Sequence, residues 1–356
     1  MAVITSSLFS NPADMLVGET LEGGWTVTRK IERPPDATGG TFCVGYEVEH
    51  QDGRQGFLKA LDFQSVFVAP DPTAELQKLT ANYNFERDML RTCGEYRMTR
   101  VAVSIADGSI RVGQHPIPVS YIIFDRASGD IRSELSKNPG MTDAQKLSVL
   151  HNVATGLKQL HSRLFAHQDL KPSNVLQFDF EDSRISKVGD LGRAAAPMIA
   201  TEHDKHDIAG DPNYAPIEHY FGHISPEFAV RRIACDLYQL GSFACFLFTG
   251  GHINGFLAQE LHNSHHPGNW NDTYEAVFPY ILDAFQRVID KVQAGLPGYV
   301  ASDLIEMIAY LCHPDPAFRG NPASRRGHGN PYALDRVVTK LDLLTKRAKL
   351  NASRAS

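Results

Sequence analysis

The sequence contains few cysteines, no long apolar run and no strong excess of charge. Its five cysteines are an odd number and include no C-x-x-C pair, so we expect reduced thiols that serve in packing, as in a cytoplasmic protein. The longest apolar stretches, such as 241–248, are far shorter than the roughly 18 to 20 residues that span a bilayer. The first residues lack the basic start and apolar core of a secretory signal. These absences predict a soluble, cytoplasmic chain without a membrane partner.

Charge and length narrow the possible classes further. The 35 Lys and Arg residues are nearly balanced by 41 Asp and Glu residues, which gives a formal net charge of -6. A mildly acidic chain has no long-range electrostatic attraction to DNA or RNA, and we expect no nucleic-acid partner. With 356 residues, of which 42% are hydrophobic, the chain is long enough for two domains or one large two-lobed domain.

The character of the sequence changes near residue 130. Before this point, β-branched and aromatic segments alternate with turn residues, which predicts an antiparallel sheet of about five strands. The predicted strands are 25–31, 44–48, 56–61, 100–104 and 119–124. Apolar residues at helical spacing predict one helix between them, at 72–92. The first part of the chain is therefore expected to be a sheet with one long helix.

After residue 130, helical patterns predominate. The predicted helices are 233–249, 273–294, 301–312, 332–350, and one that begins after Thr142, where Gln145 completes a capping box. The stretch 250–270 is rich in Gly, Asn and His, which predicts a surface loop. Metal binding by its histidines is the alternative, although the loop lacks cysteine.

Residues 166–176 carry the most specific pattern, Ala-His-Gln-Asp-Leu-Lys-Pro-Ser-Asn-Val-Leu. It matches H-x-D-L-x-x-x-N, the catalytic loop of protein kinases. Four further segments occur in the order expected of that family. They are 188–193, which resembles the D-F-G element with Leu191 for Phe; 210–218, which resembles the end of the activation segment; 236–241, which resembles the start of a long buried helix; and 313–319, which resembles the late D-P-x-x-R element. The chain therefore resembles the eukaryotic-type (Hanks-type) Ser/Thr protein kinase family.

This resemblance implies an α+β, bilobal protein kinase-like fold, with an antiparallel sheet and helix C in the N-lobe and a mainly helical C-lobe. The expected divisions are an N-terminal flank at 1–22, the N-lobe at 23–124, a hinge at 125–130, the C-lobe at 131–345 and a tail at 346–356. We expect a free-standing bacterial member of the family. Because few residues lie outside the two lobes, control is expected to come from a regulatory partner, from the C-terminal helix or from the loops.

The resemblance also assigns roles in the catalytic loop. Asp169 is expected to accept or orient the proton of the substrate hydroxyl, and Lys171 to place an ammonium group on the transferred phosphoryl group. Asn174 and Asp190 are expected to hold Mg2+, because amide and carboxylate oxygens suit this hard cation, with Mn2+ as the alternative metal. Lys171 is also typical of Ser/Thr-directed rather than Tyr-directed members.

In the N-lobe, Lys59 lies in the strand segment 57–60 at the place of the family's phosphate-binding lysine. A lysine in an apolar strand needs a partner, since an unpaired buried charge is expensive. We expect this partner to be Glu86 on helix C. Glu75 is the alternative, although an acidic residue at the start of a helix is already explained by the helix dipole.

ATP is the expected nucleotide, and two further segments are predicted to contact it. Gly39, Gly40 and Phe42 belong to a degenerate glycine loop that keeps only the middle glycine of G-x-G-x-x-G, and a plain hairpin turn is an equally weighted alternative. In the hinge, Asp125 and Ala127 are predicted by position alone to offer backbone hydrogen bonds to adenine.

Further residues are expected to support the structure. Glu218 and Arg319 should form a buried salt bridge, with two separate surface charges as the alternative. Asp236 should accept backbone N–H bonds from the catalytic loop around His167. These roles are implied by the family resemblance and make the carboxylate of Asp236 architectural rather than reactive.

Two departures from the family pattern bear on mechanism. Gln168 replaces the usual Arg, so activity should depend less on phosphorylation of the activation segment, whose only hydroxyl before its final turn is Thr201. Asp211 stands where Ser/Thr kinases usually have Thr. Its carboxylate and that of Asp169 would repel each other unless Lys171 lies between them.

The sequence therefore predicts an ATP- and Mg2+-dependent protein kinase that phosphorylates Ser/Thr hydroxyls of protein substrates and autophosphorylates. A pseudokinase that binds nucleotide or a partner protein without phosphoryl transfer is the first alternative. A Tyr-directed kinase is the second, because the loops at 189–192 and 210–214 are similar to those of the Wee/Myt branch, whose members modify tyrosine. A small-molecule kinase is a further alternative, because such enzymes share the catalytic Asp and Asn.

Overall fold

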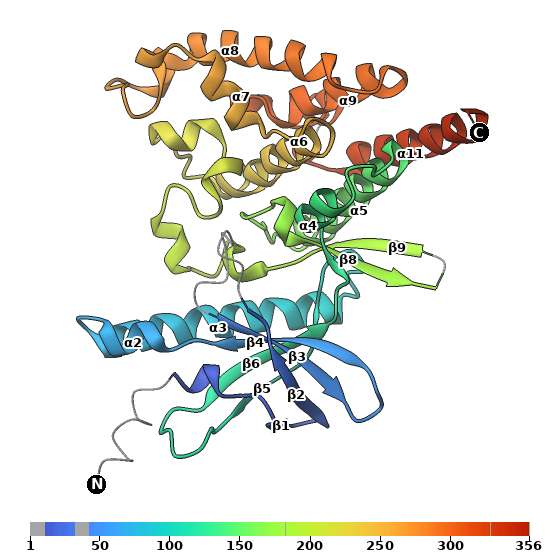
Figure 1. Ribbon diagram of the computed structural model, residues 1–356. Coiled ribbons are helices and arrows are strands. Elements are labelled where there is room, and N and C mark those ends of the chain that lie inside the picture. Colours follow the sequence, from blue (N-terminus) through green and yellow to red (C-terminus); the bar gives the residue numbers. More distant parts are fainter. Residues whose placement is uncertain (1–10, 33–42, 182, 328, 356) are drawn as a thin grey trace. The chain divides into compact units, whose positions relative to one another are not determined.

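The computed structural model describes residues 11–32, 43–181, 183–327 and 329–355 (Figure 1). The chain divides into two compact units. Unit 1 contains Met1–Met98 and Ala102–Ser128, and unit 2 contains Thr99–Val101 and Gly129–Ser356. Unit 1 is built on an antiparallel sheet with a long helix, and unit 2 is mainly helical. The predicted α+β class is therefore confirmed.

The sheet of unit 1 has six strands in the order β1-β2-β3-β4-β6-β5. They are β1 (Thr20–Leu21), β2 (Trp25–Lys30), β3 (Cys43–His50), β4 (Gln55–Leu61), β5 (Ser104–Ile110) and β6 (Val119–Asp125). Successive side chains of a strand point to opposite faces. Leu58 and Ala60 of β4 are buried in a core cluster with Trp25 and Tyr46. Lys59 therefore points to the other face of the sheet.

Helix α3 (Pro72–Glu95) follows the short helix α2 (Gln64–Val68). Asp71 caps α3 by accepting a hydrogen bond from the Ala74 N–H at 3.0 Å, and a proline at the first helical position is well tolerated. Its buried side carries Leu79, Leu90 and, among these apolar residues, the carboxylate of Glu86. A charge on the apolar side of a helix requires a partner on the element that the helix packs against.

The strand predicted at 100–104 is wrong. β5 begins only at Ser104, and Val101 lies in unit 2, where it makes an isolated parallel bridge with Val188. The Val188 N–H donates to the carbonyl of Arg100 at 2.9 Å. Gly156 makes room for this contact, since a Cβ at that position would lie 2.6 Å from the same carbonyl oxygen. Val101 is buried in unit 2. The apolar run around Val101 was therefore a correct sign of burial, but it does not show which part of the protein buries the run.

Unit 2 combines a small sheet with a set of helices. Its sheet has the order β7-β8-β9, formed by β7 (Gly129–Asp130), β8 (Val175–Phe180) and β9 (Ser183–Val188). The helices are α4 (Ile131–Lys137), α5 (Asp143–His161), α6 (Ala234–Thr249), α7 (Ile253–Glu260), α8 (Tyr274–Ala294), α9 (Gly298–Leu311), α10 (Pro322–Arg325) and α11 (Asp335–Ala355). The capping box predicted for Thr142 and Gln145 is present at the start of α5. α6 is buried over most of its length, which explains its almost uniformly apolar sequence.

Two predicted boundaries in unit 2 are wrong. The stretch 250–270 is not a single loop, because it contains α7 and a helical turn at Asn263–His265. His252 caps α7 by accepting a hydrogen bond from the Gly255 N–H at 3.0 Å. Histidine is not one of the usual N-cap residues, so the sequence does not indicate this role. The final helix begins at Asp335 rather than near residue 332 and continues to Ala355.

Neither a membrane span nor a metal cluster is found in the described part of the chain. No single helix there is long and apolar enough to cross a bilayer, and Ala229–Thr249 with Ile253–Glu260 passes such a test only as a pair bent by 83°. The described residues contain no group of three or more His, Cys, Asp or Glu side chains that could hold a metal ion. His265 instead stacks on Tyr280, with ring centroids 3.9 Å apart.

Candidate active site

One buried carboxylate holds the backbone of the catalytic loop predicted at 166–176 through hydrogen bonds. Asp236, at the start of α6, is fully buried and accepts hydrogen bonds from the backbone N–H groups of His167 at 2.7 Å and Gln168 at 2.8 Å. His161 at the end of α5 contacts the same carboxylate at 2.8 Å. Backbone donors that a sharp loop leaves without partners are satisfied in this way. The contacts expected of Asp236 are therefore present.

Asp169 and Asp211 share the ammonium group of Lys171. The Lys171 Nζ lies 3.1 Å from Asp169 Oδ2 and 3.5 Å from Asp211 Oδ2. The backbone N–H of Asp211 also donates to Asp169 Oδ1 at 2.6 Å. A cation placed between two carboxylates offsets the repulsion that was expected between Asp169 and Asp211. The substitution of Asp for the usual Thr is thus compatible with an ionised Asp169.

Burial determines the proton affinity of Asp169. Desolvation raises the pKa of this carboxyl above its usual value, Lys171 opposes the shift, and the charge of Asp190 adds to it. A carboxylate whose pKa is raised binds a proton more readily than an ordinary Asp. This direction suits the proton-accepting role predicted for Asp169, and the role itself stays a prediction.

Hydrogen bonds hold Asn174 beside Asp169 and hold Gly189, the residue before Asp190, against the catalytic loop. The Asn174 side-chain NH2 group donates to the Asp169 carbonyl at 2.8 Å and to Asp169 Oδ2 at 3.1 Å. The Gly189 N–H donates to the Asn174 carbonyl at 2.8 Å. His167 Nε2 lies 2.9 Å from the Gly189 carbonyl, which can only accept, so this nitrogen carries the proton. These bonds explain the structural role expected of His167.

The donor set around Asn174 fits a hard divalent cation. The two bonds to Asp169 use the side-chain NH2 group of Asn174, so its side-chain oxygen, a separate acceptor, is not used by them. Asp190 has a left-handed backbone with φ of 60°, an uncommon conformation for a residue other than Gly and one found at functional sites. An amide oxygen and a carboxylate are ligands that Mg2+ accepts. Asn174 and Asp190 are thus suitable metal ligands.

Lys59 of unit 1 is paired with Glu86. Its Nζ donates to the two carboxylate oxygens of Glu86 at 2.8 and 3.0 Å. Glu75, the alternative partner, instead accepts from Ser65 Oγ at 3.0 Å and lies 3.7 Å from Lys78. The pair joins β4 to α3 and satisfies both charges on the covered face of the sheet. The sequence therefore selected the correct glutamate.

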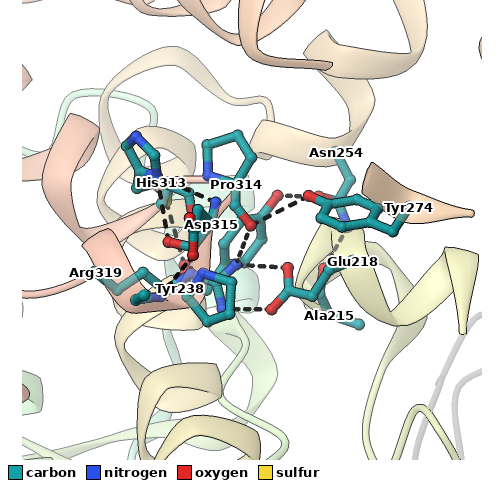
Figure 2. A network of polar contacts seen from close by, with 12 residues as sticks. Ala215, Glu218, Tyr238, Asn254, Tyr274, His313, Pro314, Asp315 and Arg319 are labelled. Atoms are coloured by element: carbon teal, nitrogen blue, oxygen red, sulfur yellow. Dashed lines mark hydrogen bonds and ion pairs between the residues drawn. The ribbon is translucent and has the colours of Figure 1, made fainter. Parts of the chain in front are cut away.

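The segment that ends in Glu218 is anchored by Arg319. Figure 2 shows the two side chains facing each other, with hydrogen bonds of 2.7 and 2.6 Å between the guanidinium and the carboxylate. Arg319 is fully buried, lies over the Tyr238 ring and donates to the His313 carbonyl at 2.8 Å. Burial alone would lower the pKa of Arg319, but the charge of Glu218, its hydrogen bonds and smaller contributions from Tyr238 and Tyr274 together outweigh burial, and the pKa is raised. The expected salt bridge is therefore formed.

Comparison with known proteins agrees with this geometry. The family model described as "Protein kinase domain" matches residues 77–328. The chain belongs to the protein kinase family. Several curated relatives are named serine/threonine-protein kinases, which agrees with the Hanks-type resemblance, and the kinase fold accounts for the sheet of unit 1 and the helices of unit 2.

The relatives are distant and much longer than this kinase chain. The serine/threonine-protein kinase atg1 of Dictyostelium discoideum is 28% identical over 67% of the chain and 30% of its own length. The leucine-rich repeat receptor-like protein kinase PXC2 of Arabidopsis thaliana is 26% identical over 59% of the chain and 20% of its own length. The serine/threonine-protein kinase PLK4 of Danio rerio is 26% identical over 51% and 16%. The chain spans less than a third of the length of these relatives.

Several residues around the kinase catalytic loop were missed from the sequence. Gln239 accepts from the Leu170 N–H and donates to the Gln168 carbonyl, both at 2.9 Å. Its position one helical turn after Asp236 was the available signal, since both side chains lie on one face of α6. Asn254 donates to the Ala215 carbonyl at 2.8 Å (Figure 2). No signal could have indicated Asn254, because its segment was predicted to be a loop.

The remaining predicted contacts to nucleotide are only partly described. Gly39, Gly40 and Phe42 lie outside the described residues. Asp125 is the last residue of β6 and pairs with Gly56 of β4, and Ala127 follows the strand. Their contact with adenine stays a prediction based on position.

Proposed function

We propose that this chain is an ATP- and Mg2+-dependent protein kinase that transfers the γ-phosphoryl group to Ser or Thr hydroxyls of protein substrates, including its own. The observation that carries the proposal is the arrangement of Asp169, Lys171 and Asn174, all of which are buried and directly bonded. A pseudokinase has no chemical need to keep all three of these groups together. Their joint presence therefore supports an active enzyme rather than a binding module.

Each side chain has a definite task in the proposed transfer. Asp169 orients the substrate hydroxyl and takes its proton as the oxygen attacks phosphorus, and its raised pKa suits this task. Lys171 is a mobile point charge that can turn from the two carboxylates, at 3.1 and 3.5 Å, toward the transferred phosphoryl group. Mg2+, held by Asn174 and Asp190, supplies charge neutralisation on the phosphates, and Mn2+ is the alternative metal.

Substrate class and location are part of the same proposal. A Lys two residues after the catalytic Asp, as in Lys171, favours Ser/Thr over Tyr as the acceptor. The Glu218–Arg319 pair fixes the end of the activation segment, which supports a protein rather than a small molecule as substrate. None of the five cysteines, which all lie in the described part of the chain, forms a disulfide, and this supports a cytoplasmic location. A regulatory partner is proposed as the source of control.

The proposal is tested by phosphoryl transfer from labelled ATP in Mg2+ to the chain itself and to a generic protein substrate. We expect transfer by the wild-type chain and a loss of at least about a hundredfold in Asp169→Ala and Asp190→Ala, because each removes a group that the proposed transfer requires. Glu260→Ala, at an exposed ion pair of α7, is the matched control. Absence of transfer by the wild type with either Mg2+ or Mn2+ would contradict the proposal.

Phosphoamino-acid analysis of the labelled product separates the acceptor classes. Phosphoserine or phosphothreonine is the expected result. Phosphotyrosine alone would show that the similarity of the loops at 189–192 and 210–214 to Wee/Myt kinases is the better guide to specificity.

A further inference from the structure

A buried arginine joins the middle of the activation segment, defined here as residues 190–218, to the catalytic loop. Arg232 lies in a π-helical turn, Ala229–Ile233, just before α6, and is 3% exposed. Its Nη2 donates to Asp204 Oδ1 at 2.6 Å, and its Nη1 donates to Gln168 Oε1 at 3.1 Å. A buried guanidinium is costly unless a carboxylate compensates it. Asp204 is the carboxylate that does so here.

Both oxygens of Asp204 are engaged. Oδ1 bonds Arg232, and Oδ2 accepts from the backbone N–H of Thr201 at 2.7 Å and from its hydroxyl at 3.1 Å. Burial alone would raise the pKa of Asp204, but the hydrogen bonds from Thr201 and the charge and hydrogen bond of Arg232 together outweigh burial, and the pKa is lowered. The side chain is therefore an anion at neutral pH. Arg231 adds a bond from its Nη2 to the Asp204 carbonyl at 2.8 Å, which fixes the same turn.

At its other end, Arg232 acts on the residue that precedes Asp169. Gln168 has a left-handed backbone with φ of 67°, a conformation that costs free energy in a residue other than Gly. Its Nε2 donates to the Arg232 carbonyl at 2.8 Å, while its Oε1 accepts from the guanidinium. Gln168 and Arg232 thus bond each other in both directions. The position of Asp169 depends on this strained residue being held.

We propose that Asp204 is a built-in counter-charge that orders the activation segment without phosphorylation and, through Arg232 and Gln168, positions Asp169. The inference rests on the proposed phosphoryl-transfer function and concerns its regulation. Asp204 supplies the anion that a phosphorylated residue would otherwise bring to a cationic site on this segment. Asp204 and Arg232 are positioning residues, since neither is required to touch substrate.

The same geometry gives phosphorylation of Thr201 an inhibitory effect. Thr201 and Tyr214 carry the only hydroxyl groups between 190 and 218, and Tyr214 is buried. A phosphate on Thr201 Oγ1 would place close to two negative charges beside the Asp204 carboxylate and would break the hydrogen bond between them. Autophosphorylation at this residue would therefore loosen the segment rather than order it.

The test compares phosphatase-treated full-length wild type with Asp204→Asn, which removes the charge and keeps the shape. Initial rates give kcat and the KM for ATP with a generic protein substrate. Amide hydrogen exchange of residues 200–211 reports the order of the segment independently of activity. For Asp204→Asn we expect kcat to fall about tenfold or more, the KM for ATP to change less than about threefold, and exchange to accelerate about tenfold or more. Asp207→Asn, an exposed carboxylate of the same segment, should leave all three unchanged.

Further variants separate positioning from a general loss of structure. Asp204→Glu should restore part of both kcat and protection, because the anion is retained. Arg232→Met combined with Asp204→Asn should be less damaging than the sum of the single changes, since the two groups act as a pair. Thr201→Ala should keep activity within about twofold, and Thr201→Glu should lower it, since a second carboxylate repels Asp204.

Each outcome decides the proposal. Unchanged activity and exchange in Asp204→Asn would overturn it, as would a dephosphorylated wild type that gains activity only when Thr201 is phosphorylated; in both cases the enzyme remains a kinase. If neither the wild type nor any variant transfers phosphate with either metal, the proposed function fails. Amide hydrogen exchange then decides the role of Asp204 alone. Faster exchange in Asp204→Asn but not in Asp207→Asn supports the counter-charge proposal, and equal exchange in the two variants overturns that proposal.

Discussion

At the scale of single residues, Asp169 is buried and shares Lys171 with Asp211, and these two features act in opposite directions on how readily Asp169 binds a proton. Burial and Asp190 raise the pKa of Asp169, while the ammonium group at 3.1 Å opposes the shift. A base must be ionised to accept a proton. The activity of the enzyme should therefore rise with pH through a pKa above the usual range of Asp.

Replacement of Lys171 by Met is predicted to move this acidic limb to higher pH. The change removes the cation and leaves the carboxylates of Asp169 and Asp211 facing each other, so the pKa of Asp169 rises further. The measurement is kcat against pH for wild type and Lys171→Met, together with the overall loss of rate. Lys137→Met, an exposed lysine of α4, should keep the wild-type profile. An unshifted limb in Lys171→Met would contradict the electrostatic account.

The same raised pKa has a consequence for stability with a definite sign. Because the folded state binds the proton of Asp169 more tightly than the unfolded state does, its contribution to stability is present below the usual pKa of Asp and is lost as pH rises through the raised pKa. The free energy of unfolding of Asp169→Asn, relative to wild type, should therefore increase as pH rises through this window. Denaturant titrations at several pH values check this difference.

At the scale of elements, Gly210 allows the activation segment to approach the catalytic loop. A Cβ at this position would lie 2.2 Å from the Gln168 carbonyl oxygen and 2.8 Å from Asp169 Oδ1. The first of these atoms belongs to the backbone and cannot move aside cheaply. Gly210→Ala is predicted to displace the Asp211–Asp169 contact and to lower kcat about tenfold or more, because misplaced catalytic groups lose rate steeply.

The control for Gly210→Ala is Gly268→Ala. A Cβ at Gly268 meets no atom within 4 Å, so this variant should keep the wild-type rate. Kinetics of the two proteins, with circular dichroism to verify folding, are the measurement. A fully active Gly210→Ala enzyme would show that the two segments can separate without cost.

The salt bridge between Glu218 and Arg319 links the end of the activation segment to the loop after α9. Glu218→Gln is predicted to lower the free energy of unfolding of unit 2 by about 3–5 kcal/mol, because it leaves a buried guanidinium without its counter-charge. Asp283→Asn breaks the exposed pair of Asp283 with Arg287 and should cost less than about 1 kcal/mol. Urea titrations measure the free energy of unfolding of both variants. Equal losses in the two variants would contradict the prediction that the buried salt bridge stabilises the protein more than the exposed one.

At the scale of the whole molecule, α11 completes the core of unit 2 from the far end of the chain. It packs beside α5 (Figure 1), with which it shares an ion pair between Asp335 and Lys158 at 2.5 Å. Leu341 and Leu344 are fully buried. Arg347 reaches Asp303 of α9 at 2.6 Å. These contacts make the last helix part of the folded unit. A tail was predicted to begin at residue 346, but α11 continues through this position without a break.

Two neighbouring leucines of α11 give a matched test. Leu344→Ala should cost about 2–5 kcal/mol of stability, because a large side chain is lost from the core. Leu343→Ala should cost less than about 0.5 kcal/mol, since Leu343 is 54% exposed. Unit 1 contains Trp25 and unit 2 contains Trp270, the two tryptophans of the chain. Fluorescence in a Trp25→Phe background therefore reports unfolding of unit 2, and equal losses would contradict the assigned packing.

The sequence predicted the parts of this protein whose chemistry depends on short, rigid spacing. Asp169, Lys171 and Asn174 lie within one loop, so their order already places them together. Glu86 was preferred over Glu75 because a buried lysine needs a partner and the first turn of a helix already explains an acid. The sheet and the main helices followed from periodicity, since burial on one face repeats every two residues in a strand and every 3.6 in a helix.

Tertiary structure decided the features that depend on which surface buries a residue. Val101 resembles a strand residue but is buried in unit 2, and His252 begins α7 where composition indicated a loop. The pairing of Arg232 with Asp204 and Gln168 joins three positions that are distant in sequence and belong to no motif. Local spacing fixes which groups can act together within a turn, but only the packed chain determines which distant charges are buried against each other and must therefore be neutralised.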